Sequence, residues 1–261
     1  MPKCVFCESM TGPFTRNEHL VPESLGGEII LPSGLVCDKC NEYFGRNVEQ
    51  PALNAPIISF LRTSLGIPNK KGKQRYHKGV QFEIFGRNPD LSLMVFPFEK
   101  LTHILRTGGG QLRIPAESGL SSICRLLLKM GIECLALSYD YDVFDAQFVR
   151  AREAARSPRK GMSWPIAYGR LKISDSSNGV STNLEGLFQE ELVYKIELAL
   201  EDEPLMVGFH FVYSWSQFLV PLNDAIDFGA FQKIIAKHNV LHSHEPPFRA
   251  VLPDISKLDT V

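Results

Sequence analysis

Two pairs of cysteines near the N-terminus constrain this chain more than any other feature. Cys4 and Cys7 form one C-x2-C pair, and Cys37 and Cys40 form the other. A C-x2-C pair brings two thiolates onto one tight turn, and two such turns supply the four soft ligands of a tetrahedral structural zinc site. We therefore predict a structural Zn²⁺ held by these four cysteines. Four free, buried thiols are the weaker alternative.

The rest of the chain is long enough to fold into an ordinary domain beside this small unit. The protein has 261 residues, 44% of them hydrophobic, which suits a folded chain with a real core. No apolar run reaches the roughly 18 residues that a membrane helix needs. The start of the sequence shows no secretory leader, so we expect a cytoplasmic location. A reducing compartment of that kind favours thiols or metal ligands over disulfides.

The segment between the cysteine pairs contains an acid and a histidine side by side. It reads NEHLVPESLGG from Asn17 to Gly27, and an amide follows the second pair directly in CDKCN. A neutral imidazole can take a proton from water near pH 7, and carboxylate and amide oxygens are ligands of hard divalent ions. The segment is therefore a candidate catalytic site. The alternative is a surface pair on a zinc module that only binds nucleic acid or protein.

EHLVP followed by LGG, with CDKCNEYFG after it, resembles the four-cysteine branch of the HNH endonuclease family. The resemblance covers only the start of the chain. It implies a ββα-metal fold in which zinc holds the two cysteine turns and a separate catalytic Mg²⁺ or Mn²⁺ lies in the cleft. By position, His19 matches the general base, Glu18 matches a ligand of the catalytic ion, and Asn41 matches a second ligand of that ion.

The same resemblance implies metal-dependent hydrolysis of phosphodiester bonds in DNA, with RNA left open as a substrate. His19 would activate water while the ion held by Glu18 and Asn41 stabilises the leaving 3′-oxygen, so that a 5′-phosphate remains. The chain departs from the family at the middle Asn, where it reads LPSGLVC. Ser33 and Asn17 are the candidates to orient the base instead. Family members often act in bacterial restriction or phage defence, and cutting of two strands by a one-site enzyme favours a homodimer.

Basic residues are concentrated outside this unit. The first 50 residues carry four Lys or Arg against seven Asp or Glu, and the net charge of the whole chain is −1. A run without acids follows, RTSLGIPNKKGKQRYHK. Because Lys and Arg make most phosphate contacts, we predict a nucleic-acid-binding loop here, and a solvated loop without a ligand is the alternative. The candidate contact residues are Lys70, Lys71, Lys73, Arg75 and Lys78.

The pattern of apolar residues beyond this loop predicts helices flanked by strands. VQFEIF and LSLMVFPF on either side of GRNPD indicate a hairpin. A long helix is predicted over SGLSSICRLLLKMGIECLAL, and a second over DVFDAQFVRAREAAR. PIAYGRLKI, ELVYKIELAL, LMVGFHFVYSW and FLVPL are predicted strands. The predicted fold class is therefore α+β.

We predict three parts along the chain. Residues 1–52 form the small ββα-metal (HNH) zinc-binding unit, 53–80 a basic linker with a short helix, and 81–261 a larger mixed α+β domain. The first boundary rests on PALNAP, whose prolines are expected to interrupt a helix begun at Asn41. Substrate recognition and dimerisation are both open as roles for the third part.

Overall fold

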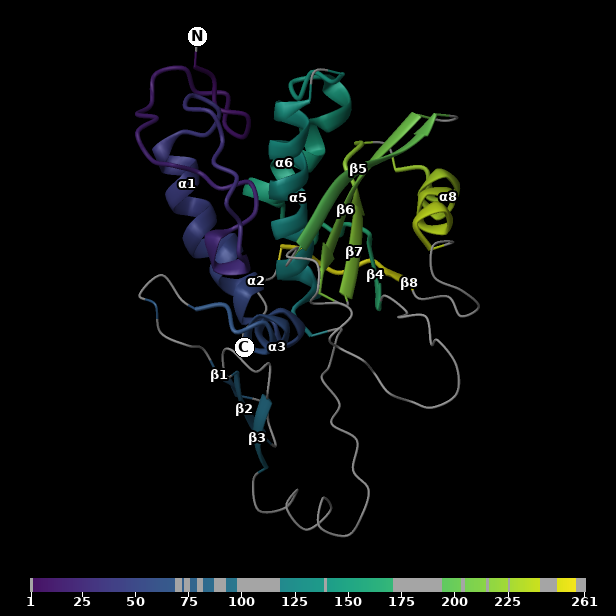
Figure 1. Ribbon diagram of the computed structural model, residues 1–261. Helices are drawn as coiled ribbons and strands as arrows, with labels where there is room; N and C mark the ends of the chain where they lie inside the picture. Colours follow the sequence, from purple (N-terminus) through teal and green to yellow (C-terminus); the bar gives the residue numbers. More distant parts are fainter. Residues whose placement is uncertain are drawn as a thin grey trace.

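The computed structural model describes residues 2–68, 72, 76–78, 82–86, 93–97, 118–138, 140–170, 194–202, 205–214, 216–224, 226–239 and 248–256. These residues form helices and antiparallel sheets, which confirms the predicted α+β class (Figure 1). The helical segments are η1 (Glu23–Leu25), α1 (Asp38–Phe44), the π-helical segment η2 (Gly45–Glu49), α2 (Gln50–Asn54), α3 (Pro56–Ser64), α5 (Leu120–Leu137), η3 (Ala146–Phe148), α6 (Val149–Arg156) and α8 (Phe228–Asn239).

The strands form one small sheet and one larger sheet. The small sheet has the order β1-β2-β3, and the larger has the order β5-β6-β7-β4-β8, with all neighbours antiparallel. The predicted hairpin is confirmed by the pairing of β2 with β3, and the four predicted strands are β4 to β7. The strands are β1 (Tyr76–Lys78), β2 (Phe82–Gly86), β3 (Leu93–Pro97), β4 (Ile166–Arg170), β5 (Tyr194–Asp202), β6 (Leu205–Tyr213), β7 (Ser216–Pro221) and β8 (Phe248–Val251).

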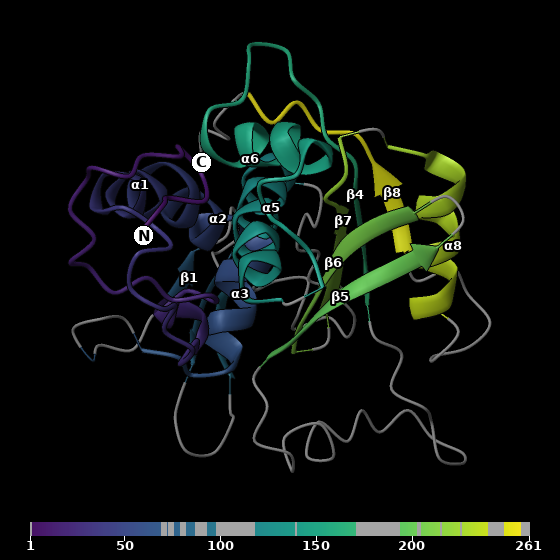
Figure 2. The ribbon, with the colours of Figure 1, turned by 90° about the horizontal axis from the view of Figure 1, so that it is seen from above.

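The larger sheet is covered by a helix on each face. Figure 2 shows α5 on one face and α8 on the other, with α1 and α2 packed beyond α5. Because side chains alternate along a strand, Phe209 and Phe211 of β6 belong to the core on the α5 face, whereas Met206 packs with Phe231 of α8. The chain is therefore layered, and α5 lies in the middle of the layers.

The position of α5 explains its composition. A helix covered on one side is amphipathic, whereas a helix covered on several sides is apolar around its circumference. Nearly every side chain of α5 is buried, from Leu120 to Leu135. The exceptions to its apolar character are charged residues that are buried as well, among them Lys129 and Glu133, each 0% exposed.

The helix that carries Asn41 continues further than the prolines of PALNAP predicted. α1, η2 and α2 follow one another from Asp38 to Asn54, so that Pro51 lies within the run. Proline lacks an N–H and its ring collides with the preceding turn of an α-helix. Here the wider π-helical turn of η2 comes directly before it, with the N–H of Gln50 bonded to the carbonyl of Gly45. The run ends only at Ala55, which is extended before Pro56 as expected.

The segment with the two cysteine pairs and the larger sheet share one hydrophobic core. Phe44 and Val48 of the first helical run, Leu128 of α5 and Phe209 of β6 belong to the same buried cluster. The Cys124 side chain is also buried in this core, and Cys134 is half-buried. Among the described helices, none combines the length and the apolar character that crossing a membrane requires.

Gly131 permits the close contact between α5 and the sheet. A Cβ at this position would lie 2.7 Å from Leu222 Cδ2 and 2.9 Å from Phe209 Cβ. We expect Gly131→Ala to lower the free energy of unfolding by about 1–3 kcal/mol, the usual cost of overpacking. Chemical denaturation measures this change.

Gly45 supplies the matched control, because it is also helical and a Cβ there meets nothing within 4 Å. Gly45→Ala should raise the free energy of unfolding by about 0.5–1 kcal/mol, since alanine loses less backbone entropy in a helix. Equal effects of the two substitutions would contradict the packing role of Gly131.

Candidate active site and metal centre

The four predicted zinc ligands meet at one point. The Sγ atoms of Cys4, Cys7, Cys37 and Cys40 all lie within 4.8 Å of one another, and those of Cys7 and Cys37 are 3.6 Å apart. Zinc–sulfur bonds of about 2.3 Å place tetrahedral sulfurs about 3.8 Å apart. The donor set therefore fits a structural Zn²⁺, as the spacing predicted.

The main chain joins the two cysteine turns. The N–H of Cys4 bonds to the carbonyl of Ser9, and the N–H of Val5 bonds to that of Leu35. Hydrogen bonding from Cys40 lowers the pKa of Cys4 to about 4, while that of Cys40 is raised by its contact with Cys4. When thiols lie this close together, ionisation of one thiol disfavours ionisation of its neighbour. A bound metal cation stabilises all of them as thiolates.

Arginines from α6 complete the surroundings of the cysteines. Arg156 Nε lies 3.1 Å from Cys40 Sγ, and its guanidinium stacks over the Tyr43 ring at 4.6 Å. Arg152 donates to the carboxylate of Glu8 at 2.8 Å. A zinc ion with four thiolates carries a net charge of −2, so a guanidinium beside a ligating sulfur offsets part of it. These residues lie far along the chain, and the sequence analysis did not find them.

The segment between the cysteine pairs forms a short hairpin. His19 and Ile30 make an antiparallel bridge, flanked by N–H bonds from Leu20 to the carbonyl of Ile29 and from Leu31 to that of Glu18. The ββ part of the predicted ββα fold is thus reduced to a single bridge before α1. Extended backbone sends neighbouring side chains to opposite sides. Accordingly the Glu18 carboxylate is buried, while the imidazole of His19 is half-exposed.

The glycines of LGG allow the turn at the end of the hairpin. Gly26 has φ 86°, a left-handed conformation that glycine adopts without strain. A Cβ on Gly27 would lie 1.8 Å from the carbonyl oxygen of Val21, so this position admits no side chain. The buried Arg62 of α3 donates to the carbonyl of Ser24 at 2.6 Å. The turn is therefore held by backbone contact and by a side chain from outside the unit.

Two residues of α1 hold the start of the hairpin. The carboxylate of Asp38 accepts hydrogen bonds from Thr15 and from the N–H of Arg16, which lower its pKa. The side-chain amide of Asn41 donates to the main-chain carbonyl of Asn17 at 3.1 Å. Asn41 thus lies beside the hairpin and supports its backbone.

The residues proposed to replace the family's middle Asn have other roles here. The hydroxyl of Ser33 donates to the carbonyl of Phe14 at 3.2 Å. The contact that Asn17 makes with Asn41 is through its main chain. A pocket lies at this point, lined by both of these residues and by Glu18 and Pro32. In the described part of the chain, neither Ser33 nor Asn17 forms a hydrogen bond with the imidazole of His19.

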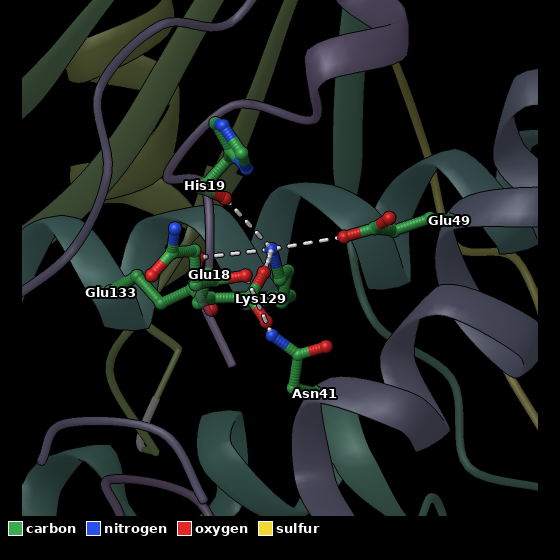
Figure 3. Close-up of polar contacts among 7 residues, drawn as sticks. Glu18, His19, Asn41, Glu49, Lys129 and Glu133 are labelled. Atoms are coloured by element: carbon green, nitrogen blue, oxygen red, sulfur yellow. Dashed lines mark hydrogen bonds and ion pairs between the residues drawn. The ribbon is translucent and has the colours of Figure 1, made fainter. Parts of the chain in front are cut away.

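The Glu18 carboxylate is bound by a lysine from α5. Lys129 Nζ lies 2.5 Å from Glu18 Oε1, and it also donates to the main-chain carbonyl of His19 at 3.2 Å. The same ammonium lies 3.1 Å from the carboxylate of Glu49 and 3.2 Å from that of Glu133. Figure 3 shows these carboxylates around the Lys129 ammonium, with the His19 ring directed away from them. We call these four residues, Glu18, Glu49, Lys129 and Glu133, the Lys129 cluster.

Burial and charge act in opposite directions within the Lys129 cluster. Burial alone would lower the pKa of Lys129, but the carboxylates of Glu133, Glu18 and Glu49 raise it above its usual value, so the side chain stays an ammonium. Burial raises the pKa of Glu18, and raises that of Glu133 further, despite the opposing effect of Lys129. Lys129 is therefore the positively charged member of the cluster and stays protonated.

The residues present do not fit the second, catalytic ion that the resemblance implies. A divalent cation bound by the Glu18 carboxylate would lie beside the Lys129 ammonium, and like charges at that separation repel. Among the described residues, the four cysteines are the group of His, Cys, Asp or Glu side chains arranged to hold a metal ion, and Glu18 is not part of such a group. Lys129 already neutralises the carboxylate that was predicted to hold Mg²⁺ or Mn²⁺.

The side chains predicted to contact nucleic acid lie outside the part of the chain that the structure describes. Lys70, Lys71, Lys73 and Arg75 lie outside the described residues. Lys78 ends the strand β1, and its side chain is not among those described. The basic loop therefore stays a prediction.

A sequence signal for part of the Lys129 cluster was available. Lys129 and Glu133 are four residues apart in an otherwise apolar helix, a spacing that puts both on one face and allows an ion pair. The partner on the hairpin had no such signal, because it is more than 100 residues away in the sequence.

Replacing one zinc ligand should release the metal. We expect the purified protein to contain one zinc per chain and Cys40→Ser to lose it. The metal supplies on the order of 10 kcal/mol of binding free energy in small zinc units, so the segment around the cysteines should then unfold. Elemental analysis and circular dichroism measure both effects. Cys134→Ser, on α5 and outside the cysteine cluster, should keep its zinc, and loss from both variants alike would contradict the assignment.

Glu133 should make stability depend on pH. Its pKa is raised on folding, so the unfolded chain loses this proton first, above about pH 4.3. The free energy of unfolding therefore decreases as the pH rises from there towards the folded pKa, by up to about 1.4 kcal/mol per pH unit. Glu133→Gln should flatten this decrease in denaturation measured between pH 5 and 7.5. Glu28→Gln, at an exposed position of the hairpin, should keep the wild-type slope, and an unchanged slope in Glu133→Gln would contradict the prediction.

The comparison with known families agrees with the geometry of the first part of the chain. No curated protein and no solved structure gives a significant match. Residues 4–56 match a family model described as HNH endonuclease. The match begins at the first cysteine and includes the hairpin with Glu18 and His19, the second cysteine pair, and Asn41. Over residues 4–56, with the four-cysteine cluster inside the match, this chain is similar to the HNH endonucleases.

Proposed function

We propose that this protein is a nuclease of the HNH type that hydrolyses phosphodiester bonds in DNA. One observation carries the proposal: residues 4–56 match the HNH endonuclease family, and within them the His19 imidazole is half-exposed on the hairpin between the two cysteine turns. A histidine held by its main chain with a partly exposed ring suits a general base. RNA remains open as a second substrate.

In this proposal His19 takes a proton from a water molecule that attacks the scissile phosphorus. A bond from the water oxygen to phosphorus forms and the bond to the 3′-oxygen breaks, so that the products carry a 5′-phosphate and a 3′-hydroxyl. The hairpin bridge and the bond from Lys129 to the His19 carbonyl hold the backbone of the base. Asn41 supports the preceding residue. A structural zinc would fix the two cysteine turns on either side.

The catalytic Mg²⁺ or Mn²⁺ that the resemblance implies would supply charge stabilisation at the leaving oxygen when bound. Glu18 is neutralised by Lys129, so no step of this proposal uses an ion at that carboxylate. Positive charge for phosphate contacts would come from the basic loop, with Lys70, Lys71, Lys73, Arg75 and Lys78 as the proposed contacts. Salt should weaken binding through these contacts.

The biological setting is proposed from the resemblance. We propose a cytoplasmic enzyme of restriction or phage defence, with residues 81–261 selecting the substrate or forming a homodimer. The shared core between the zinc-binding segment and the larger sheet supports close coupling of the two.

A non-catalytic zinc-ribbon module that binds nucleic acid is the second candidate. The specific observation in its favour is Glu18, because the acidic residue expected beside the catalytic ion is buried and bound to Lys129. The two candidates differ in whether His19 matters, since binding alone does not require a general base.

Nicking of supercoiled plasmid by the zinc-loaded protein tests the proposal. His19→Ala should lower the nicking rate by about 10²–10⁴-fold, the usual contribution of a general base, while its zinc content stays at the wild-type level. Assays with and without added Mg²⁺ or Mn²⁺, and on single-stranded DNA and RNA, define the substrate.

Glu28→Gln, an exposed substitution on the same hairpin, is the matched control and should nick at the wild-type rate. Equal nicking by His19→Ala and the wild type would remove His19 as the base. Binding without nicking on all of these substrates would favour the zinc-ribbon module.

A further inference from the structure

We infer that Lys129 is an internal cation that takes the place of a divalent ion at Glu18 and positions the hairpin carrying His19. The inference rests on the proposed function for its relevance to catalysis. Its physical content, that Glu18 binds an ammonium and not a metal, is independent of activity.

The contacts of Lys129 correspond to those expected of a bound ion. One Nζ atom contacts oxygens of three carboxyl groups, on the hairpin, on the first helical run and on α5 itself, at 2.5–3.2 Å. A fourth oxygen, the main-chain carbonyl of His19, lies at 3.2 Å. A hard cation held by carboxylates and a backbone carbonyl has the same type of oxygen-rich surroundings. The ammonium therefore supplies the positive charge that a bound metal ion would supply at this place.

The ammonium is fully buried among its oxygen partners. Lys129 is 0% exposed and Glu18 is 7% exposed. Moving a lysine out of such a cluster leaves carboxylates buried without a counter-charge, which is strongly unfavourable. A divalent ion from solution would have to displace Lys129 before it could bind the Glu18 carboxylate. The closed site therefore excludes the ion that the family resemblance implies.

Lys129 fixes the position of the His19 backbone. Lys129 does not contact the imidazole, but it binds the carbonyl of His19 and the side chain of the residue before it. Both contacts come from α5, which packs against the larger sheet. Lys129 is thus a positioning residue that fixes the hairpin to the body of the protein.

Binding of Mn²⁺ to the zinc-loaded full chain, followed by electron paramagnetic resonance of free Mn²⁺, tests the inference. The wild type and Glu18→Gln should bind Mn²⁺ equally weakly, within twofold, because the carboxylate is already neutralised. Lys129→Met leaves Glu18 and Glu49 without their counter-ion, so it should bind Mn²⁺ at least tenfold more tightly than the wild type. Added Mn²⁺ should also raise the melting temperature of this variant and leave that of the wild type unchanged.

Two further variants complete the test. Lys129→Arg keeps the positive charge and should bind Mn²⁺ as weakly as the wild type, whereas Lys129→Met combined with Glu18→Gln should lose the new binding. If Lys129→Met does not fold, the comparison of the wild type with Glu18→Gln still decides. The inference would be overturned if the wild type bound one Mn²⁺ per chain and Glu18→Gln bound it at least tenfold more weakly. Plasmid nicking is not used, so failure of the nuclease proposal and failure of this inference give different results.

Discussion

The buried ammonium of Lys129 is the interaction on which the arrangement of the site depends. It binds the hairpin through Glu18 and the His19 carbonyl, the first helical run through Glu49, and its own helix through Glu133. A charge in this position is stable only because several oxygens surround it, and those oxygens are in turn costly to bury without it. Each element of the site is therefore held in place by the requirement that this charge stay compensated.

The cysteine cluster is tied to the rest of the molecule by the same kind of chemistry. Arg156 donates to the sulfur of Cys40, and Arg152 bonds to Glu8 beside the first cysteine turn. Both arginines are on α6, which packs against α5. The cysteine-containing segment thus contacts α6 through these side chains, and its hydrophobic residues join the core of the larger sheet. This arrangement differs from an independent zinc module attached by a linker.

Local patterns predicted much of the fold and the clustering of the four cysteines. The C-x2-C spacing predicted the cysteine cluster, and the periodicity of apolar residues predicted α5, the β2–β3 hairpin and strands β4 to β7. The end of the first helical run was misplaced, because a π-helical turn accommodates Pro51. The ion pair of Glu18 could not be predicted, because its partner Lys129 comes from a helix that no local pattern connects to the hairpin.

The sequence by itself determined the donor atoms: four thiols at zinc-binding spacing, an imidazole and an acid on a glycine-ended turn, and two opposite charges one helical turn apart in an apolar helix. The tertiary structure alone decided which of these groups meet. Burial of α5 between the first helical run and the sheet placed the Lys129 ammonium against Glu18, while the extended backbone turned His19 outward. The metal-ligating cysteines can be recognised from their spacing in the sequence. Charge pairing in a core depends on which surfaces pack together, and that packing is a property of the whole chain.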